Sequence, residues 1–151
     1  MTNDPPYPFH IENLKKFKDF GGNKDLPGTS DSEDRFVRLA TYLNRLKKPK
    51  DAADALAKIY SVTRTACTPF DADQYGPTWW LSLSDCTNKV WYFNWTQNPN
   101  IVWVDLKNID FKAGSGVRML NPRLPSAVGD ISRSFEEASL ERIPTFVPNK
   151  K

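Results

Sequence analysis

Apolar residues recur at helical spacing in the first part of the chain. Between Pro8 and Phe20 they stand among lysines and are followed by Gly21-Gly22, so we predict a short amphipathic helix that ends at the glycines. A loop rich in turn-forming residues is predicted from Asp25 to Asp31.

Two longer helices are predicted to follow this loop. Asp31 or Ser32 caps the first of them and Pro49 ends it, and its apolar positions are Phe36, Leu39, Ala40, Leu43 and Leu46. Asp51 begins the second helix, whose predicted inner face consists of Ala52, Ala55, Leu56, Ile59, Tyr60 and Val62.

From Thr78 the apolar period changes to two, which is the period of a β-strand. Strands are predicted over residues 79–84, 90–95 and 101–106, and turn-forming residues separate them. Short turns between consecutive strands indicate an antiparallel meander. Both faces of the second strand are aromatic or apolar, so we expect the sheet to be covered on both sides, with this chain's helices on one face.

A further short strand is predicted around Val117–Leu120. After Pro122 the chain contains more prolines and a polar stretch of helical character near Ser132–Leu140, and we interpret residues 121–151 as a Pro-rich C-terminal arm. Residues 1–120 then form the domain proper. The expected fold class is α+β, with helices packed on an antiparallel sheet.

The composition is that of an ordinary globular domain. Hydrophobic residues make up 39% and charged residues 26% of the 151-residue chain, which is long enough for a single core. No apolar run approaches the roughly 20 residues that span a bilayer. No secretory signal is recognisable, so we expect a soluble chain; the compartment stays open, and a segment upstream could direct the protein to the periplasm. The net charge of +3 is mild, and no nucleic-acid partner is expected.

The chain has few residues suited to metal binding or to a triad. His10 is the only histidine, and Cys67 and Cys86 are the only cysteines. A Cys/His zinc site needs about four ligands, so no metal or cofactor is predicted. A Ser-His-Asp triad would depend on His10 alone, and we favour a helix-surface or packing role for it. The cysteines could form a disulfide in an oxidising compartment, but two free, interior thiols are the commoner case.

Five short words stand in a fixed order along the chain: Thr2-Asn3-Asp4-Pro5, Leu26-Pro27-Gly28, Arg35-Phe36-Val37-Arg38, Thr78-Trp79-Trp80 followed by Asp85, and Asn98-Pro99-Asn100-Ile101. With these words, residues 1–120 resemble the C-terminal part of the linear amide C–N hydrolases, the family of choloylglycine (bile salt) hydrolases and penicillin V acylases. No single word is specific. Their shared order and spacing carry the resemblance.

The resemblance implies the αββα sandwich of the N-terminal-nucleophile superfamily and hydrolysis of an acyl amide. In that family a processed N-terminal cysteine attacks the carbonyl, and its own α-amine acts as the base. The resemblance assigns two catalytic positions to this chain: Asn3 as a side-chain donor to the oxyanion, and Arg35 as a cation near the nucleophile. Arg38 is left as structural, and the five tryptophans are interpreted as core residues in preference to pocket residues.

The family's cysteine nucleophile would precede Thr2 and is therefore not in this sequence. An internal cysteine has no free α-amine, so neither Cys67 nor Cys86 can replace it. We expect the C-terminal portion of a longer hydrolase, inactive alone, whose partners are the missing N-terminal half or another copy of the chain and a small-molecule acyl amide substrate. An oligomer is expected.

Two alternatives stay open. The chain could be a non-catalytic binding or partner-subunit module derived from the same fold. Removal of Met1 could also expose Thr2, since an N-terminal threonine is a competent nucleophile. The resemblance disfavours this second alternative, because it places Thr2 within a strand beside Asn3.

Overall fold

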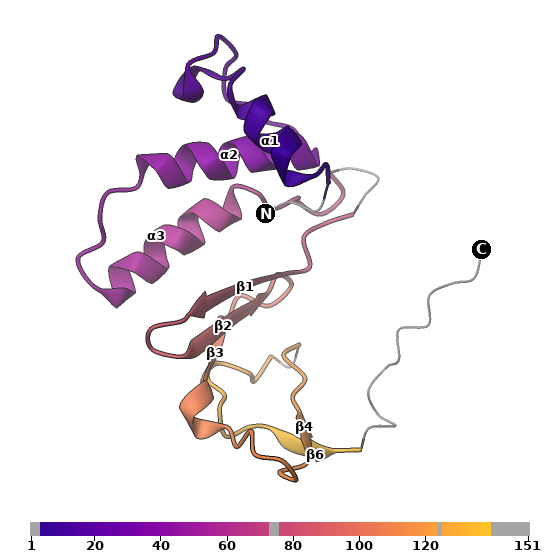
Figure 1. The fold of residues 1–151 in the computed structure, drawn as a ribbon. Helices are drawn as coiled ribbons and strands as arrows, with labels where there is room; N and C mark the ends of the chain where they lie inside the picture. The colour runs from indigo at the N-terminus through magenta and orange to yellow at the C-terminus, as the bar shows by residue number, and fades with distance from the viewer. Residues whose placement is uncertain (1–3, 73–75, 124, 140–151) are drawn as a thin grey trace. The chain divides into compact units, whose positions relative to one another are not determined.

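A computed structural model describes residues 4–72, 76–123 and 125–139 (Figure 1). The chain divides into two compact units, which we call the helical unit, Met1–Thr78, and the sheet unit, Trp79–Lys151.

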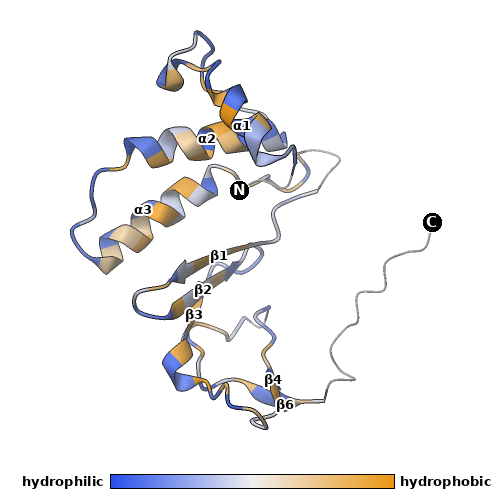
Figure 2. Cartoon of the chain, in the orientation of Figure 1, coloured by the Kyte–Doolittle hydropathy of each residue, from blue (hydrophilic) through white to orange (hydrophobic). Residues whose placement is uncertain are grey.

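The helical unit contains the two long helices that the sequence predicts. They are α2, Ser32–Arg45, and α3, Ala52–Arg64, and α2 packs against both α3 and the shorter helix α1, Tyr7–Leu14 (Figure 1). The Asp51 carboxylate caps α3 by accepting a hydrogen bond from the Asp54 backbone N–H at 2.8 Å. Hydrophobic and hydrophilic positions recur along α2 and α3 (Figure 2), as expected for helices with one buried face.

The first helix is shorter than predicted. It ends at Leu14, and Lys18–Phe20 form a separate 3₁₀ turn, η1. The reason is that the glycine pair folds the chain back, so that the Lys16 carbonyl accepts hydrogen bonds from the backbone N–H groups of Asn23 and Lys24, at 3.1 and 2.9 Å. A carbonyl used in this way is not available to continue the helix.

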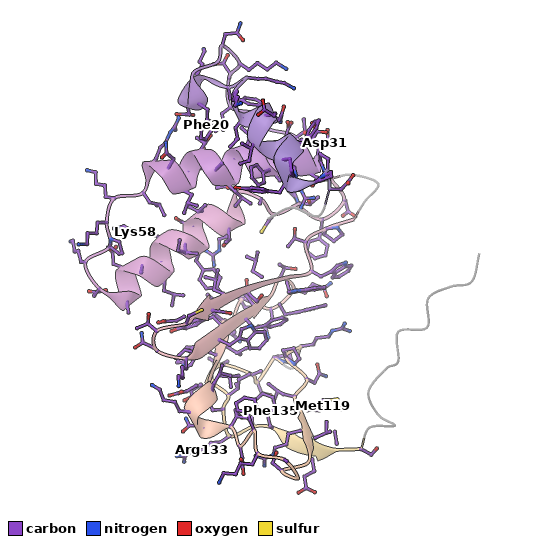
Figure 3. All side chains as sticks on the ribbon, in the orientation of Figure 1. Phe20, Asp31, Lys58, Met119, Arg133 and Phe135 are labelled. Carbon is purple, nitrogen blue, oxygen red and sulfur yellow. The ribbon has the colours of Figure 1, made fainter. Side chains whose placement is uncertain are left out.

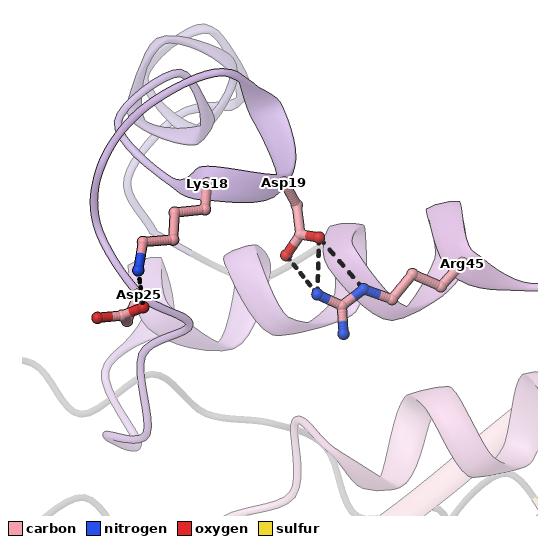
Figure 4. Close-up of polar contacts among 4 residues, drawn as sticks. All are labelled: Lys18, Asp19, Asp25 and Arg45. Atoms are coloured by element: carbon pink, nitrogen blue, oxygen red, sulfur yellow. Dashed lines mark hydrogen bonds and ion pairs between the residues drawn. The ribbon is translucent and has the colours of Figure 1, made fainter.

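Two ion pairs involve this folded-back loop (Figure 4). Arg45, in the last turn of α2, forms a two-pronged ion pair with Asp19, with Nη2 lying 2.6 and 2.7 Å from the two carboxylate oxygens. Lys18 donates to Asp25 at 2.6 Å within the loop. The loop is therefore attached to the C-terminal end of α2.

The contact between α1 and α2 is built on aromatic side chains. His10 is fully buried and stacks on Phe36, with ring centroids 4.3 Å apart and an interplanar angle of 13°. Val37 and Thr41, on α2, are also fully buried. His10 is thus a packing residue, which was one of its two predicted roles.

The sheet unit contains the predicted antiparallel meander. Its strands are β1, Trp80–Asp85, β2, Val90–Trp95, and β3, Val102–Asp105. β1 pairs with β2 so that Trp80 lies opposite Trp95, and β2 pairs with β3 so that Phe93 lies opposite Val102. The strand predicted at 117–120 is also present, as β4, Val117–Met119.

The segment after residue 128 differs from the prediction. Gly129–Asp130 form a short strand, β5, that pairs in parallel with β3. The helical character predicted near Ser132–Leu140 is wrong for the described residues, because Glu136–Ala138 form a strand, β6, that pairs with β4 in a second, two-stranded sheet. Glutamate is a good helix former, but intrinsic propensity is a weak preference, and pairing with a strand distant in sequence overrides it.

The core of the sheet unit covers one face of the meander. Val102 and Val104 pack with Ala127 and Ile131, and partly buried aromatic residues such as Trp91 and Phe93 surround them. Phe135, labelled in Figure 3, packs against the same cluster. Residues between β5 and β6 therefore complete this core.

A buried serine fixes this C-terminal segment to the sheet. The Ser132 hydroxyl donates to Asp130 Oδ1 at 2.5 Å and accepts from the Asp105 backbone N–H at 2.8 Å. Its side chain is almost fully buried. One hydroxyl thus connects the end of β3 to the residues that follow β5.

Candidate active site

Arg35 lies in the first turn of α2. Its backbone N–H donates to the Asp31 carbonyl at 2.9 Å, which is a regular helical bond, and its side chain is partly buried. The helix holds this cation beside Phe36, whose ring is fixed by the stacked His10.

Arg38 is used for structure, as expected. Its Nε donates to the Thr65 carbonyl at 2.8 Å, and its Nη1 donates to the carbonyls of Thr29 and Pro27 at 2.6 and 3.3 Å. Burial lowers the pKa of Arg38, although nearby Asp34 acts in the opposite direction. The guanidinium remains charged at neutral pH and connects the 27–29 loop to the end of α3.

The Leu-Pro-Gly loop is also attached to the first turn of α2. Thr29 Oγ1 donates to Asp34 at 2.6 Å and accepts from the Asp31 backbone N–H at 3.2 Å. Asp34 precedes Arg35 directly. The structure therefore brings together two of the five sequence words, Leu26-Pro27-Gly28 and Arg35-Phe36-Val37-Arg38.

The end of a third word reaches the same turn. The Asp4 backbone N–H donates to Ser32 Oγ, with a nitrogen–oxygen distance of 3.4 Å, and Ser32 is the first residue of α2. Asn3, the predicted oxyanion donor, lies outside the described residues. Its neighbour Asp4 lies beside the first turn of α2, which carries Arg35.

The remaining words have structural roles. Thr78 exchanges two hydrogen bonds with Thr68: the Thr78 N–H donates to the Thr68 carbonyl at 3.0 Å, and the Thr78 hydroxyl accepts from the Thr68 N–H at 2.9 Å. In the Asn-Pro-Asn turn, the Asn94 side-chain amide donates to the carbonyls of Asn98 and Asn100, at 3.3 and 3.0 Å. These contacts shape loops at the start of β1 and between β2 and β3.

Both cysteines are free thiols. Cys67 is partly buried, and this burial raises its pKa above the ordinary value, so that less of it is thiolate at neutral pH. Cys86 is exposed, so the prediction of two interior thiols is wrong for it. Cys67 therefore lacks the lowered pKa of an activated thiol nucleophile.

The tryptophans are less buried than predicted. Trp91 packs against the core of the sheet unit, but the exposed fractions of Trp79, Trp80 and Trp103 are 43%, 56% and 37%. Trp79 stacks on Trp95 with centroids 5.9 Å apart, and Arg123 lies 4.3 Å from the Trp95 ring centre. The core interpretation therefore holds for Trp91 and fails for the three exposed indoles.

The sheet unit also contains an open hollow that the sequence did not predict. Its volume is about 420 Å³, within the range of small-molecule pockets. It is lined by aromatic and aliphatic side chains with a few polar groups, namely Trp91, Val104, Leu106, Ile109, Asp110, Phe111, Ser115, Gly116, Arg118 and Phe135. These residues come from separate parts of the sequence, so no local pattern indicates them.

Residues 4–72, 76–123 and 125–139 contain no group of three or more His, Cys, Asp or Glu side chains that could hold a metal ion. None of the helices among them has the length and apolar character needed to cross a membrane.

Comparison with known proteins gives consistent matches. The family model of the linear amide C–N hydrolases, choloylglycine hydrolase family, matches residues 1–118. A penicillin V acylase of Pectobacterium atrosepticum is 34% identical over 139 residues, which cover 79% of this chain and 37% of that protein. The chain thus spans well under half the length of this curated relative.

Solved structures show the same relationship. The penicillin V acylase of Agrobacterium tumefaciens matches with a TM-score of 0.79 and 26% identity, over 92% of this chain and 47% of that one. A variant of the conjugated bile acid hydrolase of Clostridium perfringens matches in fold with a TM-score of 0.59 and 17% identity, over 73% and 42% of the two chains. The expected fold class, an α+β part of an N-terminal-nucleophile hydrolase, is confirmed. The chain belongs to the choloylglycine hydrolase family of linear amide C–N hydrolases.

Proposed function

We propose that this chain supplies the supporting part of a linear amide hydrolase centre, and that the cysteine nucleophile comes from polypeptide outside this sequence. The observation that carries the proposal is the contact between Asp4 and Ser32, which links the Thr-Asn-Asp-Pro word to the helical turn of Arg35. The family match over residues 1–118 covers both words.

Arg35 is proposed to act on the thiol of the nucleophile. A guanidinium near a thiol favours the thiolate, because it adds positive charge and does not itself release a proton in the neutral range. Its position in a packed helical turn, between Asp34 and the stacked Phe36, supports this role. Arg38 is the weaker candidate for this role, because its Nε and Nη1 donate to three backbone carbonyls.

Asn3 is proposed to stabilise the tetrahedral intermediate. Its side-chain N–H would donate to the oxygen that becomes negative when the thiolate attacks the amide carbonyl. Removal of one such donor typically costs about 3 kcal/mol of transition-state stabilisation. Asn3 is adjacent in sequence to Asp4, whose backbone N–H donates to Ser32 in α2.

The proposed substrate is a linear acyl amide, and the proposed partner is the remaining part of the hydrolase. The penicillin V acylase relatives suggest a penicillin side chain as one substrate, and the bile acid hydrolase suggests a conjugated bile acid. Neither cysteine of this chain can serve as an N-terminal nucleophile, because an internal cysteine has no free α-amine. We therefore expect no amide hydrolysis by the chain alone.

The test combines the purified chain with a chimera. The chain alone is assayed for release of the acyl group from penicillin V and from a glycine-conjugated bile acid. The chimera places this chain in the matched segment of the Pectobacterium penicillin V acylase, whose remaining sequence supplies the rest of the site. We expect no turnover by the chain alone, and turnover of penicillin V by the chimera.

Variants of the chimera test the two residues. Asn3→Ala should lower kcat by about 10²- to 10³-fold. Arg35→Met should lower the rate of thiol alkylation at the nucleophile as well as turnover, whereas Arg133→Met, at an exposed position, should change neither. Turnover by the chain alone would contradict the need for an external nucleophile. A chimera that keeps full activity in both site variants would contradict the residue assignments.

A non-catalytic module is the competing function. It predicts that the chimera folds but has no turnover. It also predicts that Asn3 and Arg35 can be replaced without consequence. The exposed tryptophans of the sheet unit are the feature that favours a binding role.

A further inference from the structure

The first turn of α2 is not capped by the side chain of its own N-cap residue. Asp31 holds the N-cap position, but within the described part of the helical unit its carboxylate forms no capping hydrogen bond. The backbone N–H groups of a first helical turn have no partner inside the helix, and an N-cap side chain usually accepts from one of them. The turn that carries Arg35 therefore depends on another group at this end of the helix.

The Thr29 hydroxyl makes a connection that replaces this cap. Its oxygen accepts from the Asp31 backbone N–H at 3.2 Å, and it donates to Asp34 Oδ2 at 2.6 Å. Asp34 is the third residue of α2, where a capping box has a Glu or Gln whose side chain bonds directly to the N–H of the N-cap residue. Aspartate is one methylene shorter than glutamate, and here the hydroxyl of Thr29 spans the gap. We call this arrangement of Asp31, Thr29 and Asp34 the relayed cap.

Thr29 is itself held by the next turn of the helix. Arg38 Nη1 donates to the Thr29 carbonyl at 2.6 Å and to the Pro27 carbonyl at 3.3 Å. Arg38 lies three residues after Arg35, so the loop is attached to α2 both before and after Arg35. A shift of Thr29 away from the helix would therefore break the relayed cap and the bonds of Arg38 together.

The turn closed by the relayed cap is the one that both proposed catalytic words reach. The Arg35 N–H donates to the Asp31 carbonyl at 2.9 Å, so Arg35 completes the first hydrogen-bonded turn of the helix. The Asp4 N–H donates to Ser32 Oγ in the same turn. Helix ends fray when their terminal N–H groups lose their partners. Loss of the relayed cap should therefore loosen the position of Arg35 and the attachment of the Thr-Asn-Asp-Pro word.

We propose that Thr29 is a positioning residue for Arg35, because its hydroxyl closes the relayed cap that holds the first turn of α2. The proposal rests on the proposed function of Arg35 as the cation near the nucleophile, and it adds to that function a residue outside the helix. Thr29 does not touch the reacting atoms. It acts through the turn, so its loss should slow the chemical step and leave substrate binding unchanged.

The penicillin V acylase chimera is the protein in which the proposal is tested. Thr29→Val removes the hydroxyl and keeps the shape of the side chain, so it should lower both kcat and the rate of thiol alkylation by about fivefold, the factor expected for loss of a typical cap. KM should stay unchanged. Thr29→Ser keeps the hydroxyl and should restore both rates, and Thr87→Val, at an exposed threonine of the sheet unit, should change neither.

A double-variant cycle separates positioning from a general loss of stability. Rates are expressed per molecule of folded chimera, isolated by size-exclusion chromatography. In an Arg35→Met background, Thr29→Val should lower kcat and the alkylation rate no further, because the group that it positions is absent. A purely structural role would lower the rates by the same factor in both backgrounds.

Hydrogen exchange gives a second readout in the purified chain, without the chimera. Thr29→Val should raise the exchange rate of the Arg35 backbone amide by about fivefold, since this N–H bonds to the Asp31 carbonyl inside the turn that the relayed cap closes. Thr29→Ser should exchange at the wild-type rate. Amides in the middle of α3 should be unaffected, which would show that the opening is local to the start of α2.

Three results would overturn the proposal. If Thr29→Val keeps the wild-type kcat, or slows the Arg35→Met chimera by the same factor, Thr29 does not act through Arg35. An Arg35 amide whose exchange rate does not respond to Thr29→Val would remove the relayed cap as the cause. Both of these results would leave the proposed function of Arg35 intact. A chimera in which Arg35→Met has no effect would refute that function, and the positioning role of Thr29 with it.

Discussion

The imidazole of His10 lies flat against the ring of Phe36, with 4.3 Å between the centroids, and this stack joins α1 to α2. Tyr7 meets the same phenylalanine edge-on at 6.2 Å. Phe36 follows Arg35 directly, so the packing of α1 also fixes the helical turn that carries the proposed catalytic cation.

Phe36→Ala should destabilise the chain. The substitution removes a partly buried ring and its two aromatic contacts, so we expect a loss of about 2–3 kcal/mol in the free energy of unfolding. Urea denaturation followed by circular dichroism measures it. Leu43→Ala, on the same helix but 55% exposed, is the control and should change stability by less than about 0.5 kcal/mol. Equal losses in both variants would show that the stack contributes nothing specific.

Arg38→Met should loosen the loop at residues 27–29. The variant keeps much of the aliphatic stem but leaves three backbone carbonyls without their donor, which should cost about 2 kcal/mol. Hydrogen exchange should show faster opening at Thr29 and around Thr65. Arg133→Met is the matched exposed control. Unchanged exchange in the 27–29 loop would mean that Thr29 and Asp34 hold it without Arg38.

Ser132 should make the stability of the chain depend on acid pH. Its hydroxyl and backbone N–H both donate to Asp130, which lowers the pKa of that carboxyl below its ordinary value near 3.8. A carboxyl whose pKa is lower in the folded state adds stability above its unfolded pKa, and this stability is lost as the pH falls through the folded pKa.

We therefore expect the difference in unfolding free energy between wild type and Ser132→Ala to be constant above about pH 5 and to shrink below the ordinary carboxyl pKa. Urea titrations at a series of pH values measure it. A difference that grows on acidification would have the wrong sign, and would remove Asp130 as the cause.

The two thiols should react at different rates. Cys86 is exposed, whereas Cys67 is partly buried and has a raised pKa, so an aromatic disulfide reagent at neutral pH should give a fast phase and a slow phase. Cys86→Ser should remove the fast phase only. A single fast phase for both thiols would show that Cys67 is more accessible than its surroundings indicate.

The long helices could be predicted because their signals are local. Asp51 caps α3 with its own side chain, whereas α2 ends at Arg45, before the stop that was predicted at Pro49. The order and antiparallel pairing of the meander strands could be predicted for the same reason, since short turns join them.

The errors arose where distant residues decide the structure. β6 forms because Glu136 and its neighbours pair with β4, which lies some twenty residues earlier, and no local pattern encodes that partner. The contact of Arg38 with Thr65, 27 residues away, is equally invisible to spacing. For the candidate site, the sequence predicted the helix that carries Arg35. The hollow at Arg118, by contrast, is assembled from separate loops and strands.

The fold-back at the glycine pair has a consequence for mutational tolerance. A Cβ at Gly22 would lie 2.1 Å from the Lys16 carbonyl carbon, and the obstacle is backbone, which no neighbouring substitution can move aside. Gly21 has a positive φ of 93° but open space around it, so asparagine should be accepted there. In a saturation library, position 22 should therefore remain glycine while position 21 admits a few alternatives, although the two residues look identical in the sequence.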